Sequence, residues 1–450
     1  MRMGNTRLSA VNNGNGNTVI SGCTANDDGG GIYMDYGKKI DGFIIADNTA
    51  TEGDGGGICN TANDATISNC RFYRNTCGGD GGGLYTDKAT VENCKFFEND
   101  CSDNGYEIST NSGSTQINNC TFTSNYSGDN VVYGGMQSNC TFPAKSSYQL
   151  TVGSGSKEDP YVIKTVDDWD VLHYMALKRQ RVVLSDGTTQ ILGDEYCLYG
   201  KYFRLDANIT VCNTVGEARE VLNYTAYSEF NGIFDGNGHT VTYVSNTGSD
   251  RNGVFGYANS ATVKNLTVNG YIKGGNRVGG IFGSTYNCTA ENCTNNATVY
   301  GTISSLGDTA SFIGGIVGHS ECSNYIGCIN NGKVEGTHEH IGGIAGYSNG
   351  DTVNDCVNNG DVVGLQKCGG IVGTTHGTVS LLNCINNATV TATYYYAGGI
   401  IGYEDSKVTA ENCINTGKVN ADAPTARYPA EGDYVIYAAS DNKYCFDIQG

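Results

Sequence analysis

Three aspartates at one repeat offset are the clearest candidates for metal chemistry in this sequence. Asp28, Asp54 and Asp80 each stand directly before a run of glycines, 26 residues apart. If that spacing is one coil of a solenoid, the carboxylates stack about 4.8 Å apart. Such like charges repel unless a cation or hydrogen bonds compensate, and calcium accepts carboxylate and carbonyl oxygens. We therefore predict no cofactor other than calcium at these aspartates, and the preferred alternative to calcium is a hydrogen bond from each residue's own turn amide.

Other acidic residues could supply the paired carboxylates of a polysaccharide lyase or a glycoside hydrolase. Asp167, Asp168 and Asp170 form one group, although acids at this place also suit the N-terminus of a helix. Asp235 and His239 form another, within an Asp-Gly-Asn-Gly-His sequence that is typical of a turn. We prefer the structural interpretation for both groups and predict no catalytic residue.

A pair of histidines could also bind a metal. His338 and His340 are two residues apart in the sequence THEHIGG. Two ligands fall short of a structural metal site, so a turn in the loop is the preferred interpretation.

Tyrosine gives the most useful indication of binding. The chain has 30 Tyr against 13 Phe and 1 Trp, and Tyr394, Tyr395 and Tyr396 stand just before a repeated Gly-Gly-Ile. Because tyrosine offers a rigid amphipathic ring at low entropic cost, sugar rings could stack there. These three residues are the candidate ligand-binding residues. The preferred alternative is a strand whose tyrosines only cover a sheet surface.

Short repeats must position all these residues. In the first region GGGIY, GGGIC and GGGLY begin at Gly29, Gly55 and Gly81. An apolar residue followed three places later by Asn recurs beside them, with a period of 22 to 27 residues. That period is too short for a βαβ unit, which needs about 30 residues. It fits one coil of a β-helix, with three short strands, an apolar interior and asparagine ladders at the turns.

A second region repeats differently, with a period that is mostly 27 to 29 residues and once 35. Each copy has a Gly-Gly-Ile followed by a cysteine, and the two series are Gly279, Gly314, Gly342, Gly369 and Gly398, and Cys293, Cys328, Cys356, Cys384 and Cys413. This region also reads as a β-helix.

The segment between the two repeat regions contains one amphipathic pattern. It predicts a helix over residues 165–179 with Asp167 as its N-cap. Its apolar side carries Val171, Leu172, Met175 and Leu177. We expect this helix to cap the open end of the second solenoid.

Together these patterns predict an all-β fold made of two right-handed parallel β-helix segments in series, with a short capping helix between them. The predicted domains are a first β-helix at 1–152, a junction and cap at 153–230, a second β-helix at 231–420, and a linker with a truncated further module at 421–450. The first repeat has no cap before it, and the last segment is too short to bury its own face. We expect the natural chain to extend beyond both ends.

The composition limits the classes of partner that this chain can bind. The formal charge of −19 and the isoelectric point of about 4.6 disfavour nucleic acid and anionic lipid, and they suit calcium, cationic partners or neutral glycans. No run of eighteen apolar residues occurs, so no membrane span is predicted. The pattern leaves the oligomeric state open.

The 19 cysteines are an odd number, which excludes a fully paired disulfide framework. Most of them recur at the repeat spacing, so we predict small thiols stacked in the core and a reducing habitat. Cysteines on neighbouring coils could still lie close enough to form disulfides.

Three family resemblances rest on these motifs. Residues 21–142, with GGGIY and the Phe-x-x-Asn pattern, resemble the repeats of polymorphic outer-membrane proteins and related bacterial surface β-helices. Residues 153–420, with DPYVI, FNGIFDGNGHTV, GVFG and five GGI copies, look like GLUG-repeat surface proteins. Residues 431–450, with Gly432, Tyr434 and Ile436, are similar to the first strands of ricin-type β-trefoil lectins.

These resemblances imply a bacterial protein, secreted or at the cell surface, that is linked to adhesion or glycan contact. The main hypothesis is a non-enzymatic adhesin whose solenoid is both stalk and binding face for glycans or host or cell-surface components, because repeated weak sites gain avidity. One alternative is a polysaccharide lyase or glycoside hydrolase of the β-helix type. Another is a purely structural spacer.

Overall fold

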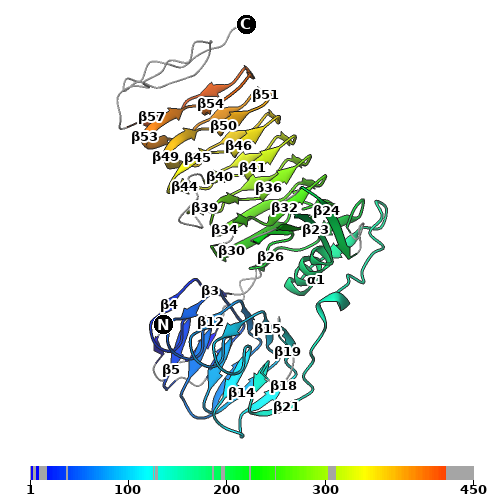
Figure 1. Cartoon of the computed structure of the whole chain (residues 1–450), viewed down its shortest axis with the longest axis vertical. Coiled ribbons are helices and arrows are strands. Elements are labelled where there is room, and N and C mark those ends of the chain that lie inside the picture. Colours follow the sequence, from blue (N-terminus) through cyan, green and yellow to red (C-terminus); the bar gives the residue numbers. More distant parts are fainter. Residues whose placement is uncertain are drawn as a thin grey trace. The chain divides into compact units, whose positions relative to one another are not determined.

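The computed structural model of this chain describes residues 2–3, 7–9, 18–36, 39–124, 126, 130–184, 187–193, 198–221, 224–248, 250–302 and 311–421 (Figure 1). These residues fall into two compact units, Met1–Tyr148 with Val244–Asn246, and Gln149–Tyr243 with Thr247–Gly450. The predicted fold class is confirmed, since each unit winds as a right-handed parallel β-solenoid and the described residues contain one α-helix.

The first unit has four strands in a coil, and each joins one of four parallel sheets. Three of these sheets carry the strands expected from the sequence. They are β1 (Arg2–Met3), β5 (Ile32–Met34), β9 (Ile58–Asn60), β13 (Leu84–Thr86), β17 (Ile108–Thr110) and β20 (Val132–Tyr133); β2 (Arg7–Ser9), β6 (Lys39–Asp41), β10 (Ala65–Ser68), β14 (Ala89–Glu92), β18 (Gln116–Asn118) and β21 (Met136–Ser138); and β3 (Thr18–Ser21), β7 (Phe43–Ala46), β11 (Arg71–Tyr73), β15 (Lys95–Phe97) and β19 (Thr121–Thr123).

A fourth sheet of two-residue strands was not predicted. It consists of β4 (Thr24–Ala25), β8 (Thr49–Ala50), β12 (Thr76–Cys77) and β16 (Asp100–Cys101). These strands are too short to show an alternating pattern in the sequence, which is why three strands per coil were expected.

The turns before β11, β15 and β19 of the third sheet follow a common rule. Asn69, Asn93 and Asn119 adopt positive φ angles of 53° to 55°, a left-handed conformation that asparagine tolerates better than most residues. The cysteine that follows each of them points inward and is at most 1% exposed. The turn thus directs one small thiol per coil into the core.

Aromatic and amide ladders fill and close the first solenoid. Phe72 and Phe96 stack with ring centroids 4.4 Å apart, as the Phe-x-x-Asn pattern predicted. Asn48 donates its side-chain amide to Asn75, and Asn75 donates to Asn99, over 2.9 and 2.8 Å. All three amides are buried, so the ladder supplies the hydrogen bonds that buried polar groups require.

The second unit has three main parallel faces, and the first two carry nine and six strands. The nine are β22 (Tyr161–Ile163), β25 (Tyr202–Leu205), β29 (Ile233–Asp235), β33 (Thr262–Lys264), β37 (Thr289–Glu291), β42 (Asn324–Ile326), β47 (Thr352–Asn354), β51 (Val379–Leu382) and β55 (Val408–Glu411). The six are β32 (Phe255–Asn259), β36 (Phe282–Tyr286), β41 (Val317–Glu321), β46 (Ala345–Asn349), β50 (Val372–His376) and β54 (Ile401–Glu404).

The third face is one sheet of 17 strands, because most coils contribute more than one segment to it. Its strands are β26 (Ile209–Val211), β30 (Thr240–Asn246), β31 (Arg251–Asn252), β34 (Thr267–Gly274), β35 (Arg277–Gly279), β38 (Thr294–Asn295), β39 (Thr298–Gly301), β40 (Phe312–Gly314), β43 (Ile329–Asn330), β44 (Val334–Gly336), β45 (Glu339–Gly342), β48 (Val357–Asn358), β49 (Val362–Gly369), β52 (Ile385–Asn386), β53 (Val390–Gly398), β56 (Ile414–Asn415) and β57 (Val419–Ala421).

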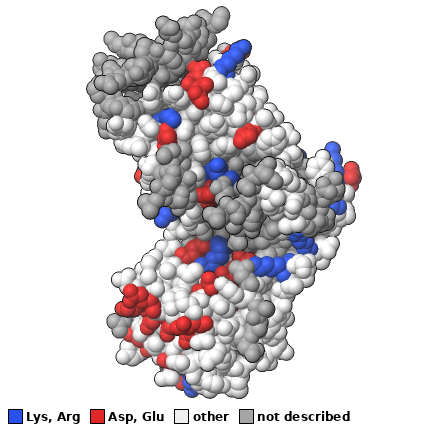
Figure 2. Space-filling model, in the orientation of Figure 1, with Lys and Arg blue, Asp and Glu red and all other residues white. Residues whose placement is uncertain are grey.

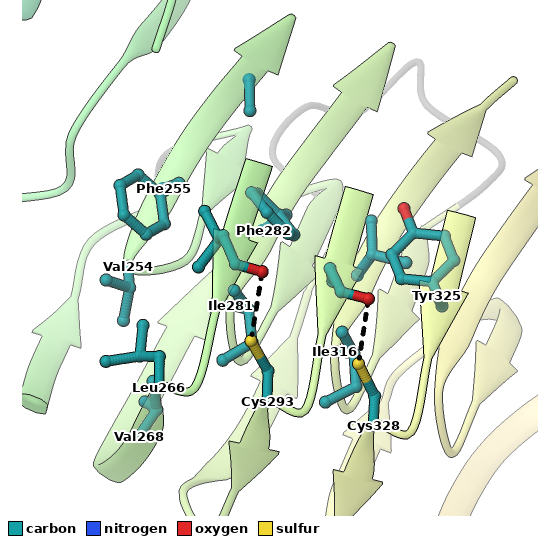
Figure 3. Packing of buried hydrophobic residues seen from close by; sticks show 14 of the residues in the cluster. Val254, Phe255, Leu266, Val268, Ile281, Phe282, Cys293, Ile316, Tyr325 and Cys328 are labelled. Carbon is teal, nitrogen blue, oxygen red and sulfur yellow. Dashed lines mark hydrogen bonds between the residues drawn. The ribbon is translucent and has the colours of Figure 1, made fainter. Parts of the chain in front are cut away.

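The core of the second unit repeats the logic of the first. Figure 3 shows Phe255, Ile281, Phe282 and Ile316 packed in the interior beside Cys293 and Cys328. The Cys293 thiol donates to the backbone carbonyl of Val263 over 3.5 Å. The predicted stack of buried thiols is confirmed for most of the described cysteines.

Helix α1 (Val166–Leu177) covers the first coils of the second unit. Trp169 is fully buried, with its ring 5.9 Å from that of Phe234, and it belongs to the same hydrophobic cluster as the coils. The prediction that Asp167 is the N-cap is wrong. Thr165 caps the helix by accepting from the Asp168 amide over 3.2 Å, and Asp168 accepts in return from the Thr165 amide over 2.9 Å, which forms a capping box.

Two further features accompany the solenoids. The junction carries an antiparallel sheet that the sequence did not predict, made of β24 (Thr189–Gly193), β23 (Arg179–Leu184), β28 (Tyr224–Ser228) and β27 (Glu217–Val221). A short 3-10 helix, η1 (Lys145–Ser147), follows the first unit's last coil. The predicted linker and lectin-like module fall on residues 422–450, outside the described part of the chain.

Candidate functional site

The three repeat aspartates form a ladder, but their hydrogen bonds differ from the own-turn interpretation made from the sequence. The Asp28 carboxylate accepts from the backbone amide of Asp54 over 2.8 Å, and Asp54 accepts from the amide of Asp80 over 2.7 Å. The Asp80 carboxylate accepts from the backbone amide of Asn104 over 2.7 Å. Each carboxylate therefore binds the next coil rather than its own turn, and the own-turn alternative is wrong.

These hydrogen bonds compensate part of the cost of stacking the charges. Burial raises the pKa of Asp54, the amide of Asp80 opposes that rise, and the neighbouring charges of Asp28 and Asp80 add to it. Among the described residues, no three His, Cys, Asp or Glu side chains converge as a metal site. Calcium at this ladder stays a prediction.

The carboxylates considered for catalysis serve the fold. Asp167 and Asp168 lie in the first turn of α1, and the buried Asp170 accepts from the side-chain amide of Asn213 over 2.9 Å. Their acidic charge suits the positive end of the helix.

Asp235 belongs to a turn. Its carboxylate accepts from the backbone amide of Asn237 over 2.9 Å and from the side chain of Asn265 over 3.0 Å. Burial opposes ionisation of Asp235, but these hydrogen bonds and the ammonium of Lys264 keep its pKa below the ordinary value. His239 closes the same turn by donating its backbone amide to Gly236 over 2.8 Å.

The two histidines of the THEHIGG sequence lie in different surroundings. The His338 ring hydrogen-bonds the hydroxyl of Thr337 over 3.0 Å, whereas the His340 ring hydrogen-bonds the hydroxyl of Thr374 over 2.7 Å. His340 instead joins a row of aromatic rings that the sequence analysis did not assemble.

This row, here called the aromatic strip, runs along one corner of the second solenoid. It consists of Phe312, His319, His340, Tyr347, Tyr396 and Tyr403. Three of its members come from the position two residues before the Gly-Gly pair in β40, β45 and β53. The other three come from one register position of the facing sheet, on β41, β46 and β54.

Four rings of the strip, those of Phe312, His319, His340 and Tyr347, contact one another closely, and Tyr396 and Tyr403 form a separate pair. Phe312 stacks on His340 with centroids 4.9 Å apart, and it meets His319 edge-on at 5.1 Å. His319 stacks on Tyr347 at 4.9 Å with the planes only 9° from parallel. Such offset and T-shaped pairs are the arrangements that aromatic quadrupoles favour, so the rings hold one another in place.

Cationic side chains cover two rings of the strip. The guanidinium of Arg277 lies 5.7 Å from the centroid of Phe312, and the ammonium of Lys367 lies 5.1 Å from that of Tyr403. Lys367 also pairs with Glu339 over 2.6 Å. These contacts place polar groups beside ring faces, as a site for an amphipathic ligand requires.

Backbone geometry helps to present these side chains. His340, Lys367 and Tyr396 occupy equivalent positions on successive coils, and all three have positive φ angles, of 65°, 55° and 57°. Few non-glycine residues adopt this conformation, and its cost is of order 1 kcal/mol or more at each position. Its recurrence at one place on three coils marks the corner of the strip as a specialised part of the fold.

The histidines of the strip are uncharged at neutral pH. Burial lowers the pKa of His319 to about 3, and the nearby charges of Arg277 and Arg251 add to that effect. Burial also lowers the pKa of His340 to about 4, with a further contribution from Lys367. The strip therefore presents neutral rings.

The tyrosines predicted to bind a ligand are only partly brought together. Tyr396 belongs to the strip, because its ring meets Tyr403 edge-on at 5.2 Å. Tyr394 is 49% exposed and lies beside it in β53. The side chain of Tyr395 is outside the described part of the chain.

The sequence analysis missed most of the strip for a simple reason. The position two residues before the Gly-Gly pair carries Arg277, Phe312, His340, Lys367 and Tyr396 in turn, so no residue type repeats there. The usable signal was the fixed offset from the Gly-Gly pair together with the absence of aliphatic residues at that offset.

Acidic side chains outnumber Lys and Arg on the face of the first unit that Figure 2 shows, in line with the charge of −19. None of the helices among the described residues is long and apolar enough to cross a membrane. A cavity of about 450 Å³ lies at the last coils of the first unit, lined by Phe122, Ser124, Tyr126, Val131, Phe142, Pro143, Ala144 and Lys145.

Comparisons with known proteins found one family model, one sequence relative and one solved structure that resemble parts of this chain. The chain is 29% identical over 185 residues to Halomucin of Haloquadratum walsbyi. These 185 residues are 40% of this chain but only 2% of the length of Halomucin. A crystal structure of a candidate immunoglobulin A1 protease from Bacteroides ovatus superposes with a TM-score of 0.46 and 20% identity, covering 63% of this chain and 83% of that one. Residues 4–142 match the family model of the right handed beta helix region.

Proposed function

We propose that this chain is a non-enzymatic binding protein, secreted or at the cell surface, whose second solenoid contacts glycans through the aromatic strip. The observation that carries the proposal is the arrangement of Phe312, His319, His340 and Tyr347 as mutually packed rings on consecutive coils, with His340 buried and the other three partly exposed. Sugar rings stack on such faces through their apolar C–H surface, while hydroxyls use polar groups at the rim.

The solenoid explains why a row suits a polymer better than a single pocket. Consecutive coils lie about 4.8 Å apart, which is close to the size of one pyranose ring. A polysaccharide laid along the strip would therefore meet rings on the coils of Phe312, His340 and Tyr396, with Lys367 on the coil between the last two. Several weak contacts of this kind add up to useful affinity without a deep cavity.

Charge supports a neutral ligand in preference to nucleic acid. The chain carries a formal charge of −19, and the strip histidines are neutral. A polyanion would gain little from this surface, since phosphate contacts depend on many unpaired cations. Neutral glycans or host or cell-surface components are the proposed partners.

Two rival functions remain testable beside this one. A polysaccharide lyase or glycoside hydrolase would need carboxylates that converge on a groove. The acidic residues considered above are occupied by helix capping, by Asn213 and by a turn. A pure spacer would need no ring surface at all, and it would leave the aromatic strip without a role.

The experiment incubates the full chain with a panel of neutral and charged polysaccharides, and follows each polymer by size-exclusion chromatography. Our proposal predicts that at least one polymer elutes earlier in the presence of protein and that none becomes shorter. A shortened polymer would contradict the non-enzymatic assignment. No change for any polymer would favour the spacer.

Calcium at Asp28, Asp54 and Asp80 is proposed as an accessory of the first solenoid. A bound ion would raise the unfolding temperature by mass action. We expect calcium to raise the melting temperature of the natural chain and to have less effect on Asp54→Asn. A natural chain that melts identically with calcium and with chelator would end this proposal.

A further inference from the structure

Two cysteines lie in register on neighbouring coils of the first unit, in the sheet of two-residue strands. The row along this sheet is Ala25, Ala50, Cys77 and Cys101, and Cys77 pairs directly with Cys101 between β12 and β16. Neighbouring strands of a sheet are about 4.8 Å apart. That spacing lies within the range of about 4.4–6.8 Å between the Cα atoms of disulfide-bonded cysteines.

These two thiols differ from the cysteines of the main core in how near they lie to the surface. Cys77 and Cys101 are 7% and 8% exposed, whereas Cys94 and Cys120, which also neighbour each other, are both 0% exposed. The pair forms a small apolar cluster of its own with Ala50, with Tyr106 packed against it. A small reagent can therefore reach Cys77 and Cys101 more easily than the core thiols.

The surroundings hold both sulfur atoms in comparable positions. The Cys77 thiol donates to the backbone carbonyl of Asp80 over 3.3 Å, and the Cys101 thiol donates to that of Asn104 over 3.4 Å. Asp80 and Asn104 are themselves joined, because the Asp80 carboxylate accepts from the Asn104 amide. The two coils are thus aligned at the place where a bond between them would form.

We propose that Cys77 and Cys101 form a disulfide between neighbouring coils when the protein meets a small-molecule disulfide such as oxidised glutathione. This inference is independent of the proposed function. It assigns the pair as a modification site of the first solenoid, on the coils that carry the aspartate ladder.

The chemistry is thiol–disulfide exchange in two steps. The Cys101 thiol loses its proton, and its thiolate attacks one sulfur of oxidised glutathione; the other sulfur leaves as a glutathione thiolate and takes up the proton. The Cys77 thiol then loses its proton, and its thiolate attacks the Cys101 sulfur, which releases the second glutathione. Two S–H bonds are lost and one S–S bond forms between the coils, while one glutathione disulfide is reduced to two thiols.

Cys101 is the better first nucleophile of the pair. Its pKa is lowered by the neighbouring Cys77 thiol, burial opposes this shift, and backbone amides of the glycine turn lower the pKa further. The thiolate is the reacting form, so a lowered pKa increases its fraction at neutral pH.

A disulfide here would join coils that the native fold already aligns. It would constrain the unfolded chain across the segment between the two cysteines, and this stabilises the folded state as long as the bond fits the native geometry. The expected consequence is a rise of a few degrees in the melting temperature of the first unit, reversed by dithiothreitol.

The test treats the full reduced chain with oxidised glutathione, blocks free thiols with N-ethylmaleimide, and maps peptides by mass spectrometry without reduction. We expect one linked peptide pair containing Cys77 and Cys101, with Cys94 and Cys120 recovered as unlinked thiols after unfolding. Recovery of Cys77 and Cys101 as unlinked thiols or as separate glutathione adducts would overturn the proposal. Equal linkage of Cys94 to Cys120 would overturn its selectivity.

The chain itself supplies a matched control. Ala50 occupies the same row on the preceding coil, so Cys101→Ala places there a residue that the row already accommodates. Oxidised glutathione should raise the melting temperature of the natural chain and leave that of Cys101→Ala unchanged. An equal rise in both proteins would place the effect elsewhere and contradict the assignment.

Discussion

At the scale of single residues, Glu107 shows how one side chain can end a ladder. It takes the place that the last glycine of the triplet holds on earlier coils, since Gly83 and Glu107 precede the paired residues Leu84 and Ile108. Its carboxylate accepts from the side-chain amide of Asn99 over 2.6 Å and from the backbone amide of Asn99 over 3.3 Å. Glu107 therefore acts as the acceptor that the next asparagine would otherwise supply.

This position is costly for a charge. Glu107 is fully buried, and its second carboxylate oxygen has no hydrogen-bond partner. Burial raises the pKa of Glu107 to about 8, although the hydrogen bonds from Asn99 oppose that rise. The folded chain thus retains a proton that the unfolded chain has lost between about pH 4.5 and pH 8.

Glu107→Gln is predicted to remove this pH dependence. Stability of the natural chain should fall as the pH rises through that window, because the folded state binds the extra proton. The amide keeps the acceptor for Asn99 and never ionises, so the variant should be more stable by about 2–4 kcal/mol at pH 8.5 and nearly equal at pH 4. Urea unfolding at both pH values measures the difference. If the unfolding free energies of the two proteins changed with pH in the same way, Glu107 would ionise in the folded chain as it does in the unfolded chain, and the prediction would be wrong.

At the scale of elements, amide ladders hold the coils of the second unit together. Asn358 is fully buried; it donates to Asn386 and accepts from Asn330, both over 2.8 Å. Its chain neighbour Asn359 belongs to a parallel exposed ladder, with bonds to Asn331 and Asn387 of the same length. The two ladders offer the same hydrogen bonds in different surroundings.

Asn358→Ala should therefore destabilise the chain much more than Asn359→Ala. The buried replacement leaves polar partners without water, at a cost of about 1–3 kcal/mol, while water can replace the exposed amide at a cost below about 1 kcal/mol. Chemical unfolding of the two variants gives the comparison. A similar loss in both would mean that burial does not determine the strength of the ladder.

The cap of α1 offers a second prediction for an element. Thr165 accepts from the Asp168 amide, and Asp168 accepts in return. Thr165→Ala should lower stability by about 1 kcal/mol. Asp167→Ala, which changes an exposed acid that is not the cap, should have a smaller effect. Thermal unfolding of the two variants distinguishes them, and a larger loss for Asp167→Ala would restore the interpretation made from the sequence.

Repeat spacing predicted the coils because a solenoid stacks like residues. Phe72 over Phe96 and Asn75 over Asn99 followed directly from the period, as did the inward cysteines. Structural features that do not repeat along the chain could not be predicted from the sequence. The strands of the fourth sheet are too short to show one, and the antiparallel sheet of the junction occurs once.

The candidate site was harder to predict than the fold for a related reason. The aromatic strip joins two sheets at a corner, and its members differ in type from coil to coil, as His340 and Tyr396 illustrate. A ladder of identical residues reveals itself in the sequence. A ladder of positions with changing residues becomes visible only when the register is known.

At the scale of the whole molecule, each solenoid is a stack of short coils in which every coil supports its neighbours. The coils supply a regular scaffold, and function lies in the side chains that depart from the repeat. In the second unit those departures gather at the corner formed by Phe312, His319, His340 and Tyr347. This agrees with a binding face distributed over several coils.

The most direct test of this account compares glycan affinity in two variants, each of which adopts a residue from the neighbouring coil. Tyr347 belongs to the strip, and the equivalent position on the next coil is Thr374. Tyr271 lies outside the strip, and the equivalent position on the next coil is Thr298. Threonine therefore suits the fold in both Tyr347→Thr and Tyr271→Thr. Titration calorimetry with the polysaccharide that binds the natural chain should show about fivefold weaker binding for Tyr347→Thr, since one aromatic contact contributes roughly 1 kcal/mol, and unchanged binding for Tyr271→Thr. Unchanged affinity in Tyr347→Thr, or an equal loss in both variants, would contradict the assignment of the aromatic strip as the binding face.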